Sequence, residues 1–378
     1  IGLDVDDPTR QQLTCIADAG GGTYHDARSQ QELNAALGAV KTDVTKDEVI
    51  VPPGMDTPTP VPTVTPTSTP TIVPNIQVSI PSQGLDTSGW IAYIGTDDNV
   101  WLVDPVSGQE HQLTSFNLGY PGSLAWSPDG SKLALTIRGG RPDMIYGSED
   151  LVVLDMDSGE LHPVREAYLG SLPHVLRVNN PTWSADGKYI YYSATTDSLN
   201  RYWKLRRILS DGTGNEEIPA MADDSWHYQD YPAASPNGEW ITFALTKRHP
   251  LVPQPTSNWG IWRSNVDGSG LRQIVSGASD KSVWSSDSTL IAYGKSWSGD
   301  YQTDGIIHLI DADGNYVRQL TNGFDPTWSA DGREIAFVRT SADRTPEIWI
   351  INVDGSNARK LTEGNAPVWQ PTFDASSD

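Results

Sequence analysis

The chain of 378 residues is acidic, with 48 Asp and Glu against 26 Lys and Arg and a formal net charge of −22 at pH 7. Phosphate backbones repel a protein of this charge, so a nucleic-acid partner is excluded and an anionic membrane surface is disfavoured. The single cysteine, Cys15, allows neither a disulfide framework nor a thiolate metal site. A membrane-spanning helix needs about 18 consecutive apolar residues, and no apolar run in the sequence is nearly that long. We therefore predict no membrane insertion within this chain.

Residues 1–45 predict a short α/β fragment in the order strand, helix, strand, helix. Residues 1–5 have the apolar character of a strand end, and residues 23–25 that of a second short strand. Ser29 and Glu32 form a capping box at the start of the second helix.

With Leu-Thr-Cys-Ile-Ala at residues 13–17, Gly-Gly-Thr-Tyr at residues 21–24 and Glu-Leu at residues 32–33, this fragment resembles the C-terminal end of a von Willebrand factor type A domain. The resemblance implies that the other half of such a domain lies upstream of Ile1. That family holds a metal with an Asp-x-Ser-x-Ser loop, which has no match here, so the resemblance implies no metal ligand.

Residues 46–88 predict a linker, because nine prolines alternate there mainly with Thr and Val. Proline at this density favours an extended spacer of about 3 Å per residue. Thr-Pro tracts are typical of stalks outside the cytoplasm, so we expect a periplasmic or extracellular protein; the alternative is an undecorated spacer between domains. Residues 76–80 alternate between apolar and polar, which predicts an added strand along the domain that follows.

The rest of the chain repeats a Trp-Ser-x-Asp-Gly turn followed by an apolar run. Three clear copies, two worn copies and a final partial one begin at Trp126, Trp183, Ala234, Trp284, Trp328 and Trp369. The steps between these positions are 57, 51, 50, 44 and 41 residues, which is the period of four-stranded propeller blades. Asp-Gly turns between alternating runs are strong hairpin signals, since glycine adopts the required positive φ without strain.

The first and last blade-like segments are both incomplete. Residues 90–94, 99–104 and 109–114 match the second, third and fourth strands of a blade, whereas residues 366–369 supply only an inner strand. We therefore expect the two ends to share one blade and to close the ring, which removes exposed sheet edges. The predicted fold class is all-β: a six-bladed β-propeller over residues 89–373, preceded by the α/β fragment and the linker.

With its Trp-Ser-x-Asp-Gly turns, Asp-Gly-Ser turns and Arg-x-Leu-Thr strand ends, this region resembles the six-bladed TolB-like propellers over nearly 290 residues. The resemblance implies the fold and no single function, because the repeat occurs in periplasmic trafficking proteins, in envelope proteins and in the lids of serine peptidases.

The repeated residues themselves are assigned to structure. We expect the Trp side chains to pack between blades. Asp129, Asp186 and Asp331 are predicted to accept backbone hydrogen bonds within their own turns. Residues 311–315 resemble the opening of a calcium loop, but no glutamate stands at the loop's end, so a hairpin turn is predicted.

Function is expected on the face that carries the long, unequal connections between strands, called here the long-loop face. The opposite face, called the tight-turn face, carries the short Asp-Gly turns. Aromatic and Arg side chains in variable loops are typical of binding hot spots, although any one of them could instead pack between blades. The candidate binding residues are Arg141, Tyr146, Trp226, His227, Tyr228, Arg248, Trp259, Trp297 and Tyr301.

The sequence contains no Gly-x-Ser-x-Gly, His-Glu-x-x-His or phosphate-binding Gly loop, so we predict no catalytic residue, no metal and no cofactor. The favoured hypothesis is a non-enzymatic binding or scaffold protein of the cell envelope or extracellular space. Its expected partner is a protein, and the negative charge favours a basic one. The alternatives are a propeller lid or substrate filter of a peptidase-like hydrolase, a metal-assisted hydrolase, and a glycan-binding lectin.

Overall fold

In the computed structural model the chain divides into two compact units, Ile1–Thr69 and Pro70–Asp378. The structure describes residues 2–3, 26–27, 76–81, 86–117, 119–139, 149–165, 177–195, 203–218, 228–246, 260–277, 279–295 and 305–371.

In the first unit, β1 (Gly2–Leu3) pairs in parallel with β2 (Asp26–Ala27). The first strand lies inside the predicted strand end, and the second lies directly after residues 23–25. Parallel pairing requires a crossover connection between the two strands. The two predicted helices and the stretches that carry the type A resemblance lie outside the described residues.

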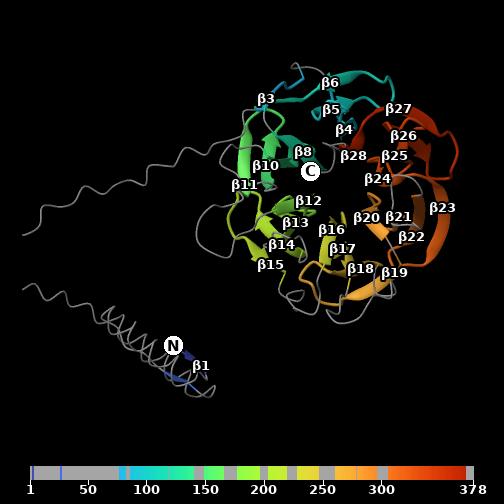
Figure 1. Cartoon of the computed structure of the whole chain (residues 1–378). Coiled ribbons are helices and arrows are strands. Elements are labelled where there is room, and N and C mark those ends of the chain that lie inside the picture. The colour runs from blue at the N-terminus through green and yellow to red at the C-terminus, as the bar shows by residue number, and fades with distance from the viewer. Residues whose placement is uncertain are drawn as a thin grey trace, which may run out of the picture. The chain divides into compact units, whose positions relative to one another are not determined.

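The second unit is a six-bladed propeller in which four-stranded sheets follow one another around an axis (Figure 1). The first blade contains β28 (Asn365–Trp369), β4 (Ile91–Ile94), β5 (Val100–Val103) and β6 (Glu110–Gln112). The second contains β8 (Tyr120–Trp126), β9 (Lys132–Arg138), β10 (Glu149–Asp155) and β11 (Leu161–Arg165). The third contains β12 (Arg177–Trp183), β13 (Tyr189–Thr195), β14 (Trp203–Leu209) and β15 (Glu216–Glu217).

The remaining three blades follow in chain order (Figure 1). The fourth contains β16 (Tyr228–Ala234), β17 (Trp240–Thr246), β18 (Gly260–Asn265) and β19 (Arg272–Ser276). The fifth contains β20 (Ser279–Trp284), β21 (Leu290–Lys295), β22 (Ile306–Asp311) and β23 (Tyr316–Asn322). The sixth contains β24 (Phe324–Trp328), β25 (Glu334–Thr340), β26 (Pro346–Asn352) and β27 (Arg359–Glu363). The all-β, six-bladed fold predicted from the repeat is therefore confirmed.

The ring closes as predicted, with the two ends of the propeller in one sheet. In Figure 1 the last strand, β28, lies against β4, and the register pairs Asn365 with Ile94 and Trp369 with Ile91. The end of the linker also joins the propeller, because β3 (Ile76–Val78) pairs antiparallel with β7 (Thr114–Phe116). Both the shared blade and the added strand were predicted from the sequence.

Four of the repeated Trp side chains link their inner strand to the blade before it. Trp126 Nε1 donates to Val368 O at 3.2 Å, and Trp183 Nε1 donates to Ala125 O at 3.1 Å. The indoles of Trp284 and Trp328 make the same bond, at 3.1 Å, to the carbonyl oxygens of Ala233 and Val283. These four indoles are buried. The prediction that they serve packing between blades is confirmed, with a directional hydrogen bond in addition.

Blade four departs from this pattern because Ala234 stands in the Trp place and has no side-chain N–H to donate. Other contacts join blades three and four. Gln229, a buried residue of β16, accepts a hydrogen bond from Leu205 N at 3.1 Å. A single parallel bridge between Trp203 and Tyr228 merges the two blades into one continuous sheet.

The repeated turns are held by their Ser and Asp side chains. Ser184 Oγ donates to Asp186 Oδ1, which also accepts from Lys188 N at 3.1 Å, while Tyr189 N donates to Ser184 Oγ at 2.8 Å. Gly187 completes the turn at a φ of 67°, a conformation that glycine adopts without strain. The turns at Asp129 and Asp331 have the same bonds, so the predicted role of these aspartates is confirmed.

The loop at residues 311–315 is a hairpin turn between β22 and β23, as predicted. Asp311 Oδ1 accepts hydrogen bonds from the backbone N–H groups of Asp313 at 2.9 Å and Asn315 at 2.8 Å. Its other oxygen accepts from Asn315 Nδ2 at 2.8 Å.

Removal of residues 365–378 should destabilise the whole propeller, because it deletes β28 and opens the ring. We expect a fall in thermal midpoint of about 10 °C or more, since a loss of roughly 4 kcal/mol corresponds to such a shift in a protein of this size. Circular dichroism on the full chain and on the truncated chain measures this. A matched control that lacks only residues 372–378 keeps β28 and should unfold like the full chain; an equal midpoint in both truncations would contradict the closure.

The turn aspartates should make stability depend on acid. Hydrogen bonds from serine hydroxyls hold the pKa of Asp186, Asp287 and Asp331 below its usual value. A lowered folded-state pKa stabilises the fold above the unfolded value of about 3.9, and this contribution disappears as the pH falls through the folded pKa. The triple Asp→Asn variant should therefore show a shallower fall of the unfolding midpoint from about pH 5 to about pH 2.5 than the parent chain. Parallel curves for the two proteins would refute the assignment.

Candidate binding face

The structure describes one of the nine predicted binding residues. Tyr228 begins β16, where its backbone pairs with Trp203 and Thr246. The other eight lie outside the described residues: Arg141, Tyr146, Trp226, His227, Arg248, Trp259, Trp297 and Tyr301. That they gather into one surface stays a prediction. The structure does describe the strand ends next to the long loops and the contacts made there.

Several inner strands bulge at the same point near the long-loop face. Asn180, Tyr231, Asp325 and Ala366 each have a φ between 49° and 53°, and each precedes a proline. The ladder register shifts at each of these places. A non-glycine residue at positive φ costs about 1–3 kcal/mol, and bulges commonly redirect side chains next to functional sites. The inner strands of four blades therefore each contain a strained bend at the corresponding position.

Polar side chains at these bends connect the second, third and fourth blades. Ser123 Oγ donates to Asn179 Oδ1 at 2.9 Å, and the same hydroxyl accepts from Asn180 N at 3.0 Å. Asn180 Nδ2 in turn donates to Asp230 Oδ1 at 2.9 Å. Asp230 is 3% exposed and also accepts from Tyr231 N at 2.8 Å. This network orients a buried carboxylate at the long-loop end of the inner strands.

An ion pair between a partly exposed arginine and a buried glutamate lies beside this network, at the base of the connection that contains Arg141 and Tyr146. Arg138 ends β9 and Glu149 begins β10, and Arg138 Nε lies 2.8 Å from Glu149 Oε1. The Glu149 side chain is 4% exposed, and among the described residues its Oε2 has no hydrogen-bond partner. Burial raises the pKa of Glu149, although the Arg138 and Arg177 guanidinium groups oppose the shift; Asp230 adds to it.

Sequence reasoning missed Glu149, Arg177 and Asp230 because it looked within the loops. A signal was present, since Glu149 and Arg177 begin strands that follow variable connections and Asp230 lies two residues after the start of β16. Among the residues that the structure describes, no three His, Cys, Asp or Glu side chains come together to hold a metal ion.

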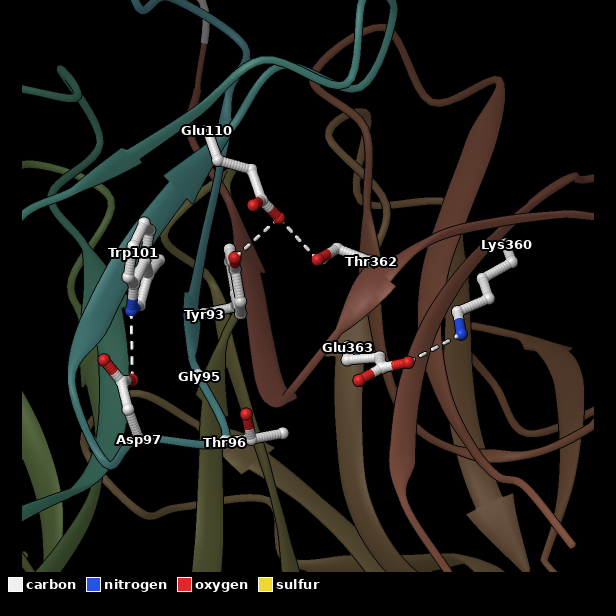
Figure 2. Close-up of a pocket in the computed structure, with 9 residues that line it drawn as sticks. All are labelled: Tyr93, Gly95, Thr96, Asp97, Trp101, Glu110, Lys360, Thr362 and Glu363. Atoms are coloured by element: carbon white, nitrogen blue, oxygen red, sulfur yellow. Dashed lines mark hydrogen bonds and ion pairs between the residues drawn. The ribbon is translucent and has the colours of Figure 1, made fainter. Parts of the chain in front are cut away.

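A pocket with a volume of about 550 Å³ lies between the first and sixth blades, and we call it the seam pocket. Figure 2 shows its lining side chains converging from both blades. They are Tyr93, Gly95, Thr96, Asp97, Trp101 and Glu110 of blade one and Lys360, Thr362 and Glu363 of blade six. The pocket reaches the long-loop face, because Thr96 and Asp97 lie in the β4–β5 connection and Glu363 ends β27 just before the crossover to β28.

The Glu110 carboxylate bridges the two blades (Figure 2). Tyr93 donates its hydroxyl to Glu110 Oε1 at 2.8 Å, and Thr362 Oγ1 donates to the same oxygen from the other side. Burial raises the pKa of Tyr93, so this phenol stays a donor at every physiological pH. The bridge joins positions 252 residues apart in the sequence. Thr362 ends an Arg-x-Leu-Thr motif of the repeat, but nothing in the repeat marks Glu110 as its partner, which is why the sequence did not reveal this site.

The wall and floor of the seam pocket are held in place by further contacts. Trp101 Nε1 donates to Asp97 Oδ1 at 3.1 Å, and the indole lies so close to Gly95 that a Cβ there would be 2.8 Å from Trp101 Cδ1. On the opposite wall, Lys360 Nζ lies 3.2 Å from Glu363 Oε1 (Figure 2). The same ammonium group lies 2.8 Å from Glu347 Oε1. The aromatic and acidic side chains are thus fixed before any ligand arrives.

The tight-turn end of the propeller differs in character. A cavity of about 370 Å³ there is lined by the five repeated tryptophans together with Thr182, Pro128, Pro236, Pro371 and small Ala and Ser residues. None of these described lining side chains carries a charge. The repeated tryptophans therefore have a second role besides packing, as the walls of this cavity.

The propeller has the fold of TolB. The solved TolB of Acinetobacter baumannii superposes with a TM-score of 0.58 at 18% identity, over 78% of this chain and 68% of that one. A putative TolB from Agrobacterium tumefaciens gives 0.55 at 16% identity, over 74% and 92%. A chain from a nidogen/laminin complex gives 0.54 at 11% identity, over 75% and 98%.

Sequence comparison finds less. An uncharacterized protein of Agrobacterium fabrum is 28% identical over 199 residues, which cover 45% of this chain and 59% of that protein. The chain thus spans less than two thirds of the length of this curated relative. No family model matches the sequence. Within the described parts of the chain, no helix is long and apolar enough to cross a membrane.

The Glu149→Gln variant should gain stability over the parent chain as the pH rises. A carboxyl with a raised folded-state pKa stabilises the fold below the unfolded pKa of about 4.3, and this contribution is lost as the pH rises through the folded pKa. Glutamine keeps the shape and does not ionise, so the difference in free energy of unfolding should grow from about pH 4 to about pH 8. Urea denaturation at a series of pH values measures it.

Arg138→Gln is the matched control for this pair. It leaves the buried Glu149 carboxylate without its cation and should destabilise the fold most at high pH, which is the opposite trend. A difference that stays constant with pH in the Glu149→Gln variant would contradict the assignment.

Proposed function

We propose that this chain is a non-enzymatic binding or scaffold protein of the periplasm or the extracellular space, and that its propeller binds a protein partner through the long-loop face. The TolB-like fold supports this, since TolB structures are similar over most of the propeller. A further similar chain comes from a complex between nidogen and laminin. A rigid ring that displays unequal loops is suited to recognition.

The observation that carries the proposal is the difference between the two ends of the ring. Charged and polar groups from separate blades meet at the long-loop end, where Asp230 and Glu149 are buried and already oriented. The cavity at the tight-turn end is lined by neutral side chains alone, among the described residues. Preorganised polar groups reduce the entropy cost of binding, so the long-loop end is the better recognition surface.

The charge of the chain indicates the kind of partner. A net charge of −22 attracts a basic protein and accelerates encounter over about a Debye length of 8–10 Å. A basic partner also complements the carboxylates of the seam pocket. We therefore propose a partner with a positively charged contact surface.

Capture of the partner from envelope extract tests the face. Three immobilised full chains are compared: the parent, Trp226→Ala with Trp297→Ala in the long loops, and Pro236→Ala with Ser286→Ala at the tight-turn end. The long-loop variant should lose the partner, because each aromatic anchor contributes roughly 2 kcal/mol, or about thirtyfold in affinity. The tight-turn variant should capture as the parent does, and capture should weaken as salt rises.

Two outcomes would contradict the proposal. Loss of the partner in the tight-turn variant alone would place recognition on the opposite face. Identical capture by all three chains would show that neither end of the propeller takes part in binding.

A further inference from the structure

We propose that the seam pocket binds the side-chain ammonium group of a lysine presented by a partner protein. This assignment rests on the proposed function in that it gives the long-loop face a specific chemical target. It comes from the charge balance, the open acceptor positions and the aromatic wall of the pocket.

The pocket carries negative charge that the chain itself does not neutralise. Three carboxylates, Asp97, Glu110 and Glu363, and one ammonium group, Lys360, line it. The Lys360 charge is shared between Glu363 and Glu347. No described cation lies within ion-pair distance of Asp97 or Glu110, so these two carboxylates lack a counterion in this part of the chain.

The hydrogen bonds already present select among cations. Glu110 Oε1 accepts two hydroxyl donors and is filled, whereas no described residue donates to Oε2. Asp97 Oδ1 is likewise filled by the Trp101 indole and the Asn99 backbone N–H, while Asp97 Oδ2 accepts from Asn99 Nδ2 at 3.0 Å and keeps one acceptor position. A guanidinium group prefers two free oxygens of one carboxylate, but an ammonium group is a point charge whose three donors suit single oxygens on separate carboxylates. The pocket therefore favours lysine over arginine.

The aromatic wall suits the alkyl chain of such a ligand. Trp101 is half-buried, and the close approach of Gly95 together with the bond to Asp97 fixes the orientation of its ring. An indole face attracts an ammonium group electrostatically and packs against methylene groups. A volume of about 550 Å³ falls within the range of about 300–1,000 Å³ of small-ligand pockets, and it leaves room for the whole side chain and its backbone.

Ligand-observed NMR on the full chain tests the chemistry with a defined probe, Nα-acetyl-lysine methylamide. We expect saturable binding that weakens at least tenfold when the ε-amine is acetylated, because the acetyl group removes the charge. The arginine analogue should bind more weakly than the lysine probe. Cadaverine, a free diamine, should bind no tighter than the lysine probe, since it lacks the peptide groups that the remaining volume accommodates.

Variants locate the site. Glu110→Gln and Trp101→Leu should each weaken the lysine probe about tenfold. Gly95→Ala should also weaken it, because a Cβ there would lie 2.7 Å from Asp97 Oδ1 and 2.8 Å from Trp101 Cδ1 and would force both side chains to move. This variant removes no charged group and leaves the Glu110 bridge intact, so it tests the site if Glu110→Gln fails to fold. The matched controls Glu239→Gln and Tyr316→Leu remove an exposed carboxylate and an exposed aromatic ring elsewhere and should change nothing.

Several results would overturn the assignment. Equal binding of the acetylated probe, or of N-acetylglucosamine, would show that charge does not select the ligand and would indicate a sugar site. Tighter binding of cadaverine would identify a free amine as the ligand. Unchanged affinity in both Trp101→Leu and Gly95→Ala would place any binding elsewhere. Because the probe is defined, failure here is distinct from failure of the partner capture with the loop variants.

Discussion

The propeller depends on hydrogen bonds from buried indoles of one blade to backbone carbonyls of the blade before it. The bond from Trp126 to Val368 matters most, because it joins positions 242 residues apart and connects the second blade to the strand that closes the ring. A single four-stranded blade leaves both of its faces in water. Each blade therefore gains its stability from its neighbours. The inner edge of β4 in the first blade stays unpaired until β28, the last strand, returns and pairs with it.

Closure of the ring also determines where a pocket can combine side chains from the two ends of the propeller. The seam between blades one and six is the one place where the two ends of the propeller meet, and the Glu110 bridge to Tyr93 and Thr362 crosses it. Elsewhere around the ring, neighbouring blades follow directly in sequence. A pocket at the seam consequently combines side chains that sequence distance keeps apart, and its geometry exists only in the closed ring.

The two ends of the ring differ in the side chains that line them. At the tight-turn end, Ser and Asp side chains saturate the backbone of short turns, and the indoles form a neutral cavity. At the long-loop end, positive-φ residues before proline hold strained bends, and the side chains of Glu149 and Asp230 are buried. Strained backbone and buried polar groups reduce stability, and proteins commonly retain such features at functional sites.

The number of blades could be predicted from the sequence, and so could the shared blade, the added strand and the role of the turn aspartates. These features depend on local chemistry, because an Asp-Gly turn, an alternating strand and a repeat spacing are each readable within a few dozen residues. Two contacts between blades became visible only in the folded structure. Gln229 links blade four, which lacks the repeated Trp, to blade three, and Asn180 donates to Asp230 at the long-loop end. The tertiary structure alone also assembled Tyr93, Glu110 and Thr362 into a pocket, since contacts across a closed ring leave no periodic trace in the chain.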